Sequence, residues 1–132
     1  MDAFWPGPLT LVFNQRPDTV PDYVTRGQET VAVRMPNHPV ALQLLQMAGI
    51  PIAAPSANLS GHESPTDAEQ VHRDLDGRIA AVVDGGTCSV GVASTILDVS
   101  GNVPVILRRG TITREQIEQV TGMQIRDAVG SV

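Results

Sequence analysis

A short loop after residue 54 carries most of the side chains in this sequence that are suited to binding an anion. Its small hydroxyls, amide and glycine occur in the order Pro55-Ser56-Ala57-Asn58-Leu59-Ser60-Gly61, followed by Ser64-Pro65-Thr66. Ser and Asn offer short hydrogen-bonding arms, and a glycine lets the backbone approach a ligand closely. The loop therefore suits an anion. The alternative is a turn whose Ser and Asn side chains bond to their own backbone, and the residues alone leave both open.

Two arginines directly follow apolar runs that are predicted to be strands. Arg34 follows Val31-Ala32-Val33, and Arg108 follows residues 103–107. The Arg34 guanidinium either forms paired hydrogen bonds with a carboxylate or lies at a rim with its stem on apolar surface. Ser94 lies in a third apolar run, where its hydroxyl either bonds to nearby backbone or faces a ligand.

The histidines and the single cysteine give no second candidate site. His38, His62 and His72 have no metal-ligand spacing with Cys88 or with carboxylates. Residues 84–86 lack the glycine spacing of a phosphate fingerprint. We therefore predict no metal ligands among the protein side chains.

Composition restricts the class of protein. The chain has 132 residues, of which 42% are hydrophobic, and its formal net charge is −5. This length suits one domain with a real core, and the acidic balance argues against a large nucleic-acid surface. No apolar run approaches the roughly 20 residues of a membrane span, and no secretory pattern begins the chain. We expect a cytoplasmic protein without membrane contact.

The elements that must position these residues alternate between strands and helices. Val- and Ile-rich runs predict strands at residues 9–13, 30–34, 50–54, 79–83, 93–99 and 103–107. Helical spacing predicts helices at residues 39–48, 67–75 and 114–120, the last two opened by the capping boxes Thr66-x-x-Glu69 and Thr113-x-x-Gln116. Residues 100–102 predict a hairpin, and residues 126–132 a frayed tail. The class is α/β or mixed α+β.

Four stretches, in this order, resemble the YrdC-like threonylcarbamoyl-AMP synthases. They are Phe4-Trp5-Pro6-Gly7-Pro8-Leu9-Thr10, Val31-Ala32-Val33-Arg34 with Pro36, the loop Pro55 to Gly61, and Ser94-Thr95-Ile96-Leu97-Asp98 followed by Ile106-Leu107-Arg108-x-Gly110. The resemblance runs from about residue 4 to residue 121. It implies a YrdC-like twisted open sheet with flanking helices.

The resemblance also implies substrates and their contacts. ATP would be bound by Thr30, Ser56, Asn58, Ser64 and Arg108, and L-threonine by Arg34, Ala54 and Ser94. Mg²⁺ would accompany the ATP phosphates. Threonine, bicarbonate and ATP would give threonylcarbamoyl-AMP and pyrophosphate. The adenylate would serve tRNA threonylcarbamoyladenosine modification, through partner proteins.

One departure from the family pattern is the absence of lysine: all nine basic residues are arginine. The family pairs its Ser-x-Asn loop with an N-terminal lysine and arginine, so no catalytic residue is assigned here. We expect residues 1–132 to form one partial YrdC-like domain that lacks its N-terminal segment and is inactive alone. Two alternatives stay open, a carbamoyl-adenylate-forming domain of a hydrogenase-maturation carbamoyltransferase and a non-catalytic binder of double-stranded RNA.

Overall fold

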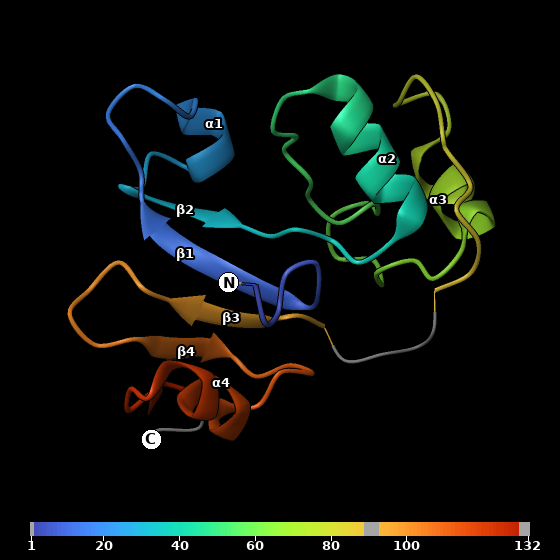
Figure 1. Ribbon diagram of the computed structural model, residues 1–132. Coiled ribbons are helices and arrows are strands. Elements are labelled where there is room, and N and C mark those ends of the chain that lie inside the picture. The colour runs from blue at the N-terminus through green and yellow to red at the C-terminus, as the bar shows by residue number, and fades with distance from the viewer. Residues whose placement is uncertain (1, 89–92, 130–132) are drawn as a thin grey trace. The chain divides into compact units, whose positions relative to one another are not determined.

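A mixed five-stranded sheet organises the first of two units in the chain (Figure 1). Its strand order is β2 (Thr30–Val33), β1 (Leu9–Asn14), β3 (Thr95–Asp98), β4 (Val105–Arg108) and β5 (Arg126–Asp127). The computed structural model describes residues 2–88 and 93–129. Unit 1 comprises Met1–Leu42 and Val92–Val132, and unit 2 comprises Gln43–Gly91. Among the described residues, no helix is long and apolar enough to cross a membrane.

The strands of unit 1 confirm the predicted mixed α/β class. The central pair β1 and β3 is parallel, with Leu9 opposite Thr95, while β2 and β4 run antiparallel to these neighbours. The antiparallel β3–β4 pair confirms the hairpin predicted at residues 100–102.

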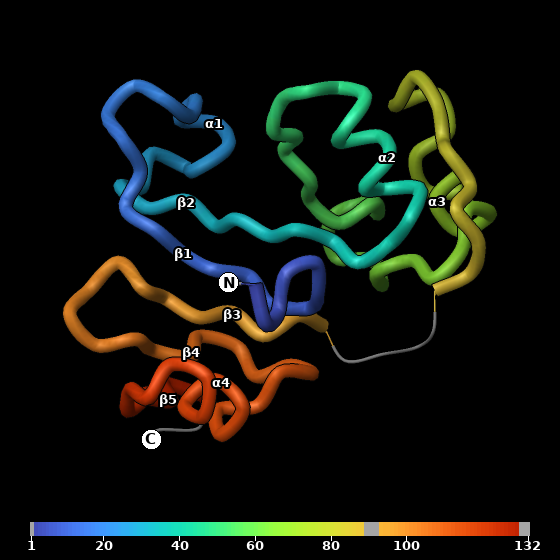
Figure 2. The backbone as a smooth tube through the Cα atoms, in the orientation of Figure 1, coloured from blue at the N-terminus to red at the C-terminus, as the bar shows by residue number. Residues whose placement is uncertain are grey.

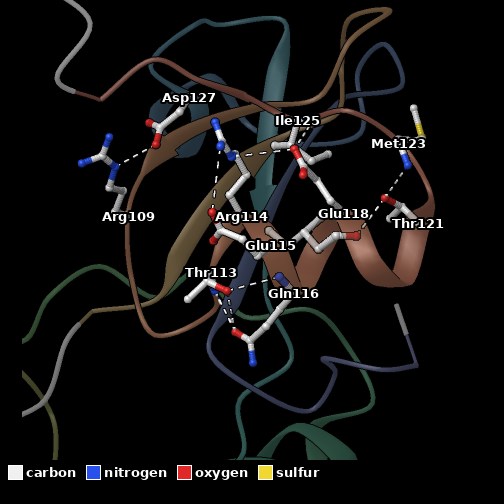
Figure 3. Close-up of polar contacts among 11 residues, drawn as sticks. Arg109, Thr113, Arg114, Glu115, Gln116, Glu118, Thr121, Met123, Ile125 and Asp127 are labelled. Atoms are coloured by element: carbon white, nitrogen blue, oxygen red, sulfur yellow. Dashed lines mark hydrogen bonds and ion pairs between the residues drawn. The ribbon is translucent and has the colours of Figure 1, made fainter.

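One face of this sheet forms the core together with the last helix. Six residues share nearly complete burial and contact one another: Leu9, Leu11, Leu97, Ile106, Ile117 and Ile125. Ile117 belongs to α4 (Arg114–Thr121), which begins with the predicted capping box. The backbone N–H of Gln116 donates to Thr113 Oγ1, and the backbone N–H of Thr113 donates to Gln116 Oε1 (Figure 3). These bonds satisfy backbone donors that the first turn of a helix would leave unpaired.

Two helices precede unit 2 in the chain or lead into it. The polar segment before β2 contains α1 (Asp22–Thr25), one turn that no periodic pattern in the sequence predicts. The predicted helix at residues 39–48 is confirmed as α2 (Pro39–Ala48), which leads from unit 1 into unit 2. His38 Nδ1 accepts from the Val40 N–H in its first turn.

Unit 2 departs from the sequence prediction in its strands. The helix predicted after the loop is present as α3 (Ala68–Leu75), but its N-cap is Asp67 rather than Thr66, because Asp67 Oδ1 accepts from the Gln70 N–H. Residues 50–54 and 79–83, predicted as strands, have no strand structure and are exposed. These predictions are wrong, because an apolar run becomes a strand only where a second strand accepts its hydrogen bonds.

The tail prediction is wrong for its first residues. Arg126 and Asp127 form β5, which pairs in parallel with Val105 and Ile106 of β4. The neighbouring Ile125 is 2% exposed. Burial of this side chain explains why the segment is held to the sheet. Residues 130–132 of the predicted tail lie outside the described residues.

Candidate functional site

Ser94 and Arg108 are in direct contact in unit 1. Arg108 Nε donates to the Ser94 carbonyl oxygen at 3.0 Å, and Arg108 Nη2 donates to Ser94 Oγ at 3.0 Å. Ser94 precedes β3 and is 7% exposed, whereas Arg108 ends β4 and is exposed. The antiparallel register places Arg108 opposite Ile96, two residues after Ser94. Strand pairing therefore brings together two residues that were predicted to bind different substrates.

The backbone around Ser94 is tightly confined by the connection that follows β4, whose path Figure 2 shows. A Cβ atom on Gly110 would lie 2.3 Å from both the Ala93 carbonyl oxygen and the Thr95 nitrogen. The Thr95 side chain is fully buried, and its hydroxyl donates to the Ile112 carbonyl oxygen at 2.6 Å. The Thr95 N–H donates to the Pro8 carbonyl oxygen at 3.0 Å. Only a glycine at position 110 allows this approach.

Thr30 begins β2, and Arg34 directly follows its last residue. Ala32 is opposite Val12 and Thr30 is opposite Asn14. Side chains alternate along a strand, so Thr30 and Ala32 share the face of Asn14 and Val12. The register changes past Val33, because the Gly7 N–H donates to the Met35 carbonyl oxygen at 2.9 Å. Four residues of extended chain span about 13 Å. Thr30 and Arg34 therefore lie near opposite ends of β2.

The loop that carries Ser56, Asn58 and Ser64 belongs to unit 2 and has no helix or strand. Gly61 has a φ of +87° and lies in a turn closed by the His62 N–H, which donates to the Leu59 carbonyl oxygen at 3.0 Å. That backbone conformation favours glycine. Ser56, Ser64 and the preceding Ala54 are exposed.

Helix α3 anchors this loop through one carboxylate. Asp74 Oδ2 accepts from the Leu59 N–H at 3.3 Å and lies 3.2 Å from His62 Nδ1. Asn58 adds bonds within the loop, since its Nδ2 donates to the carbonyl oxygens of Leu59 and His62 at 2.8 and 3.0 Å. The loop conformation therefore depends on a few side chains rather than on strand pairing.

Asn58 is left with a buried acceptor that has no partner. Its Oδ1 is a buried atom without a hydrogen bond, and the two carbonyl contacts of Nδ2 fix this orientation of the amide, because a rotated amide would set oxygen against oxygen. An unpaired amide oxygen suits a water bound to Mg²⁺ or a ligand N–H, rather than a phosphate oxygen. Among residues 2–88 and 93–129, no group of three or more His, Cys, Asp and Glu could hold a metal ion.

A separate cavity of about 330 Å³ lies beside α4 and contains Arg109, Arg114 and Asp127, but none of the predicted site residues. Arg109 Nε donates to Asp127 Oδ2 at 2.7 Å (Figure 3). Its Nη2 donates to the Val129 carbonyl oxygen at 3.0 Å. The hydrogen bond from Arg109 lowers the pKa of Asp127 below its ordinary value. Arg109 thus secures β5 to the end of β4.

Comparison with known proteins identifies the family. A family model for Sua5, YciO and YrdC, described as "Telomere recombination", matches residues 1–110. The chain belongs to the Sua5/YciO/YrdC family. The match includes the four motifs on which the resemblance rests.

Curated relatives from this family are named threonylcarbamoyl-AMP synthases. The Bacillus subtilis protein is 59% identical over 122 residues, which cover 92% of this chain and 35% of the relative. The Pyrococcus abyssi protein is 50% identical over 127 residues, which cover 96% of this chain and 37% of the relative. The chain therefore spans about a third of the length of these relatives.

Solved structures of family members share the fold. The crystal structure of P. abyssi Sua5 complexed with L-threonine matches with a TM-score of 0.86 and 49% identity, over 96% of this chain and 36% of that one. The Escherichia coli YciO structure matches with a TM-score of 0.73 at 24% identity, over 84% of this chain and 54% of that one, which shows the fold alone. The predicted YrdC-like sheet with flanking helices is confirmed.

Sequence reasoning missed three residues that support the predicted site. Thr10 contacts the Ser94 hydroxyl, and Gly110 lies against the Ser94 backbone. Asp74 contacts the loop at residues 55–64, called the signature loop below. Thr10 and Gly110 stand inside the quoted motifs, so their place in these motifs was an available signal. Asp74 had none, because its contact joins positions 15 residues apart through an irregular loop.

Proposed function

We propose that this chain carries part of the site of an L-threonylcarbamoyladenylate synthase, a nucleotidyltransferase of tRNA threonylcarbamoyladenosine modification. The observation that carries the proposal is the contact of Arg108 with Ser94 at the ends of two paired strands. The naming of relatives as threonylcarbamoyl-AMP synthases supports the reaction class. We place the protein in the cytoplasm, with partner proteins that use the adenylate on tRNA.

Binding of the amino-acid substrate is the role that we propose for Arg34 and Ser94. The guanidinium of Arg34 matches a carboxylate in paired geometry, and this contact is worth more than one to a neutral group. A Sua5 structure complexed with L-threonine supports threonine as the amino acid. The backbone at Ala54 is proposed to meet the same substrate.

Binding of the nucleotide, ATP, is the role that we propose for five residues: Thr30, Ser56, Asn58, Ser64 and Arg108. The loop residues are neutral, so Arg108 supplies protein charge toward the phosphates. Mg²⁺, carried on the ATP phosphates, would neutralise the rest of their charge, and Asn58 Oδ1 is the protein atom suited to a water of its shell.

The proposed reaction has two steps. The threonine amine combines with bicarbonate, giving a carbamate and water. A carbamate oxygen then attacks the α-phosphorus of ATP, and the bond from that phosphorus to pyrophosphate breaks. The protein residues bind and orient the reactants, which is the main source of rate in such a transfer.

A segment exchange with the B. subtilis relative tests the proposal. The matching 122 residues of that synthase would be replaced by this chain, and pyrophosphate release from ATP measured with and without threonine and bicarbonate. We expect turnover that depends on both. Arg34→Lys in the exchanged protein should raise the KM for threonine more than that for ATP, because lysine keeps the positive charge but does not form the paired hydrogen bonds of a guanidinium with a carboxylate. A folded exchanged protein without turnover would overturn the proposal.

The 132-residue chain alone should show no threonine-dependent turnover. It contains no lysine, and losing one electrostatic donor at a reacting centre costs roughly a hundred- to thousandfold in rate. The same pyrophosphate assay measures this. Turnover like that of the B. subtilis enzyme would show that the family's lysine is dispensable.

A further inference from the structure

The hydroxyl of Thr10 lies against Ser94, and the function proposed above gives it no role. The two side-chain oxygens, Thr10 Oγ1 and Ser94 Oγ, are 2.8 Å apart. Thr10 is on β1 opposite Ile96 of the parallel strand β3. Ser94 precedes Ile96 by two residues, so alternation puts both hydroxyls on one face.

Hydrogen-bond accounting restricts what the Ser94 hydroxyl can do. A guanidinium only donates, so Ser94 Oγ accepts from Arg108 Nη2. Ser94 Oγ then has one hydrogen and one further acceptor position. If Ser94 donates its hydrogen to Thr10, none is left for a ligand. If Thr10 donates instead, Ser94 accepts twice and its hydrogen points elsewhere.

The backbone leaves this choice to the two hydroxyls. The Ser94 carbonyl oxygen accepts a hydrogen bond from Arg108 Nε. Gly110 lies so close that a Cβ atom added to it would be 2.5 Å from the Ser94 carbonyl carbon. Ser94 is 7% exposed, so its orientation is set by protein neighbours rather than by bulk water. Rotation of the two O–H groups is the freedom that remains.

The charge on this face selects the second arrangement. Arg108 carries positive charge directly against Ser94, which favours an anionic ligand with acceptor oxygens. We propose that Thr10 is a positioning residue: it donates to Ser94 Oγ and thereby directs the Ser94 hydrogen to a carboxylate oxygen of the amino acid. This inference rests on the proposed binding of L-threonine.

The test is an NMR titration of the isotope-labelled 132-residue chain with L-threonine and, separately, with L-threoninol, in which a CH₂OH group replaces the carboxylate. Thr10→Val removes the hydroxyl at nearly constant shape, and Thr10→Ser keeps it. The matched control is Thr121→Val, which removes a hydroxyl that donates to the Ile117 carbonyl oxygen on α4. Thermal unfolding checks that each variant folds.

We expect Thr10→Val to weaken L-threonine binding about three- to tenfold, the usual effect of one hydrogen bond. Binding of L-threoninol should change less than about twofold, and Thr10→Ser and Thr121→Val should bind L-threonine within about twofold of the parent chain. Equal loss for both ligands, no loss in Thr10→Val, or no rescue by Thr10→Ser would each overturn the inference alone. A parent chain that does not bind L-threonine would overturn the proposed amino-acid site and this inference with it.

Discussion

The sheet of unit 1 and the signature loop of unit 2 hold polar residues in different ways. Ser94 is nearly buried, bonded twice to Arg108, and confined by Gly110. Ser56 and Ser64 are exposed in a segment without regular structure. Strand pairing fixes a side chain through many backbone bonds, whereas a loop relies on a few side-chain contacts. Unit 1 is therefore preorganised by its fold, and the loop by Asp74 and Asn58.

The largest expected difference between the two units is the loss of unfolding free energy when a hydrophobic side chain is shortened. Ile106 is 2% exposed in unit 1, and Ile52 is 53% exposed in unit 2. We expect Ile106→Ala to lower the free energy of unfolding by about 2–5 kcal/mol and Ile52→Ala by less than about 0.5 kcal/mol. Urea unfolding followed by circular dichroism measures both. Similar losses at the two sites would mean that residues 50–54 are buried in solution.

The backbone clamp on Ser94 gives the next largest effect. Gly110→Ala sets a Cβ 2.3 Å from backbone atoms, while Gly101→Ala meets nothing within 4 Å. Overpacking of this kind costs about 1–3 kcal/mol. We expect that loss in Gly110→Ala and almost none in Gly101→Ala, by urea unfolding. A Gly110→Ala chain as stable as Gly101→Ala would refute the close approach.

Much of unit 1 could be predicted from the sequence, because its strands and α4 have both a hydrophobic pattern and turn or capping residues that mark their ends. The Thr113 capping box and the turn at residues 100–102 predicted their elements correctly. The apolar runs at residues 50–54 and 79–83 failed, because hydrophobic pattern indicates a need for burial but does not supply a pairing partner. Contacts such as Thr10 with Ser94, 84 residues apart, follow from strand order, which the sequence does not state.

The anchoring of the signature loop predicts a smaller, local effect. Asp74→Ala removes the acceptor of the Leu59 N–H. Loss of about 1 kcal/mol should speed hydrogen exchange of the Leu59 amide roughly fivefold, with amides of β3 unchanged. Asp76→Ala is the control, since Asp76 caps α3 through its backbone N–H. An unchanged Leu59 exchange rate would show that the loop holds its shape without α3.

The smallest effect concerns the ion pair at the end of the sheet. The pKa of Asp127 is lowered chiefly by the hydrogen bond from Arg109, so this pair stabilises the fold above the ordinary aspartate pKa. That contribution disappears as the pH falls through the lowered pKa. In Arg109→Gln the pKa of Asp127 should rise toward its ordinary value, which NMR titration of the carboxyl carbon measures. An unchanged pKa would assign the shift to another group.

The central claim is that the sheet of unit 1 provides the main contacts to the amino acid. The loop at residues 55–64 of unit 2 is expected to change less when the amino acid binds. The most direct measurement is the map of amide chemical-shift changes when L-threonine is added to the labelled chain. We predict the largest changes at Thr10, Arg34, Ser94 and Arg108, with smaller ones at residues 55–64. Changes confined to residues 55–64, or no changes at saturating L-threonine, would contradict the account.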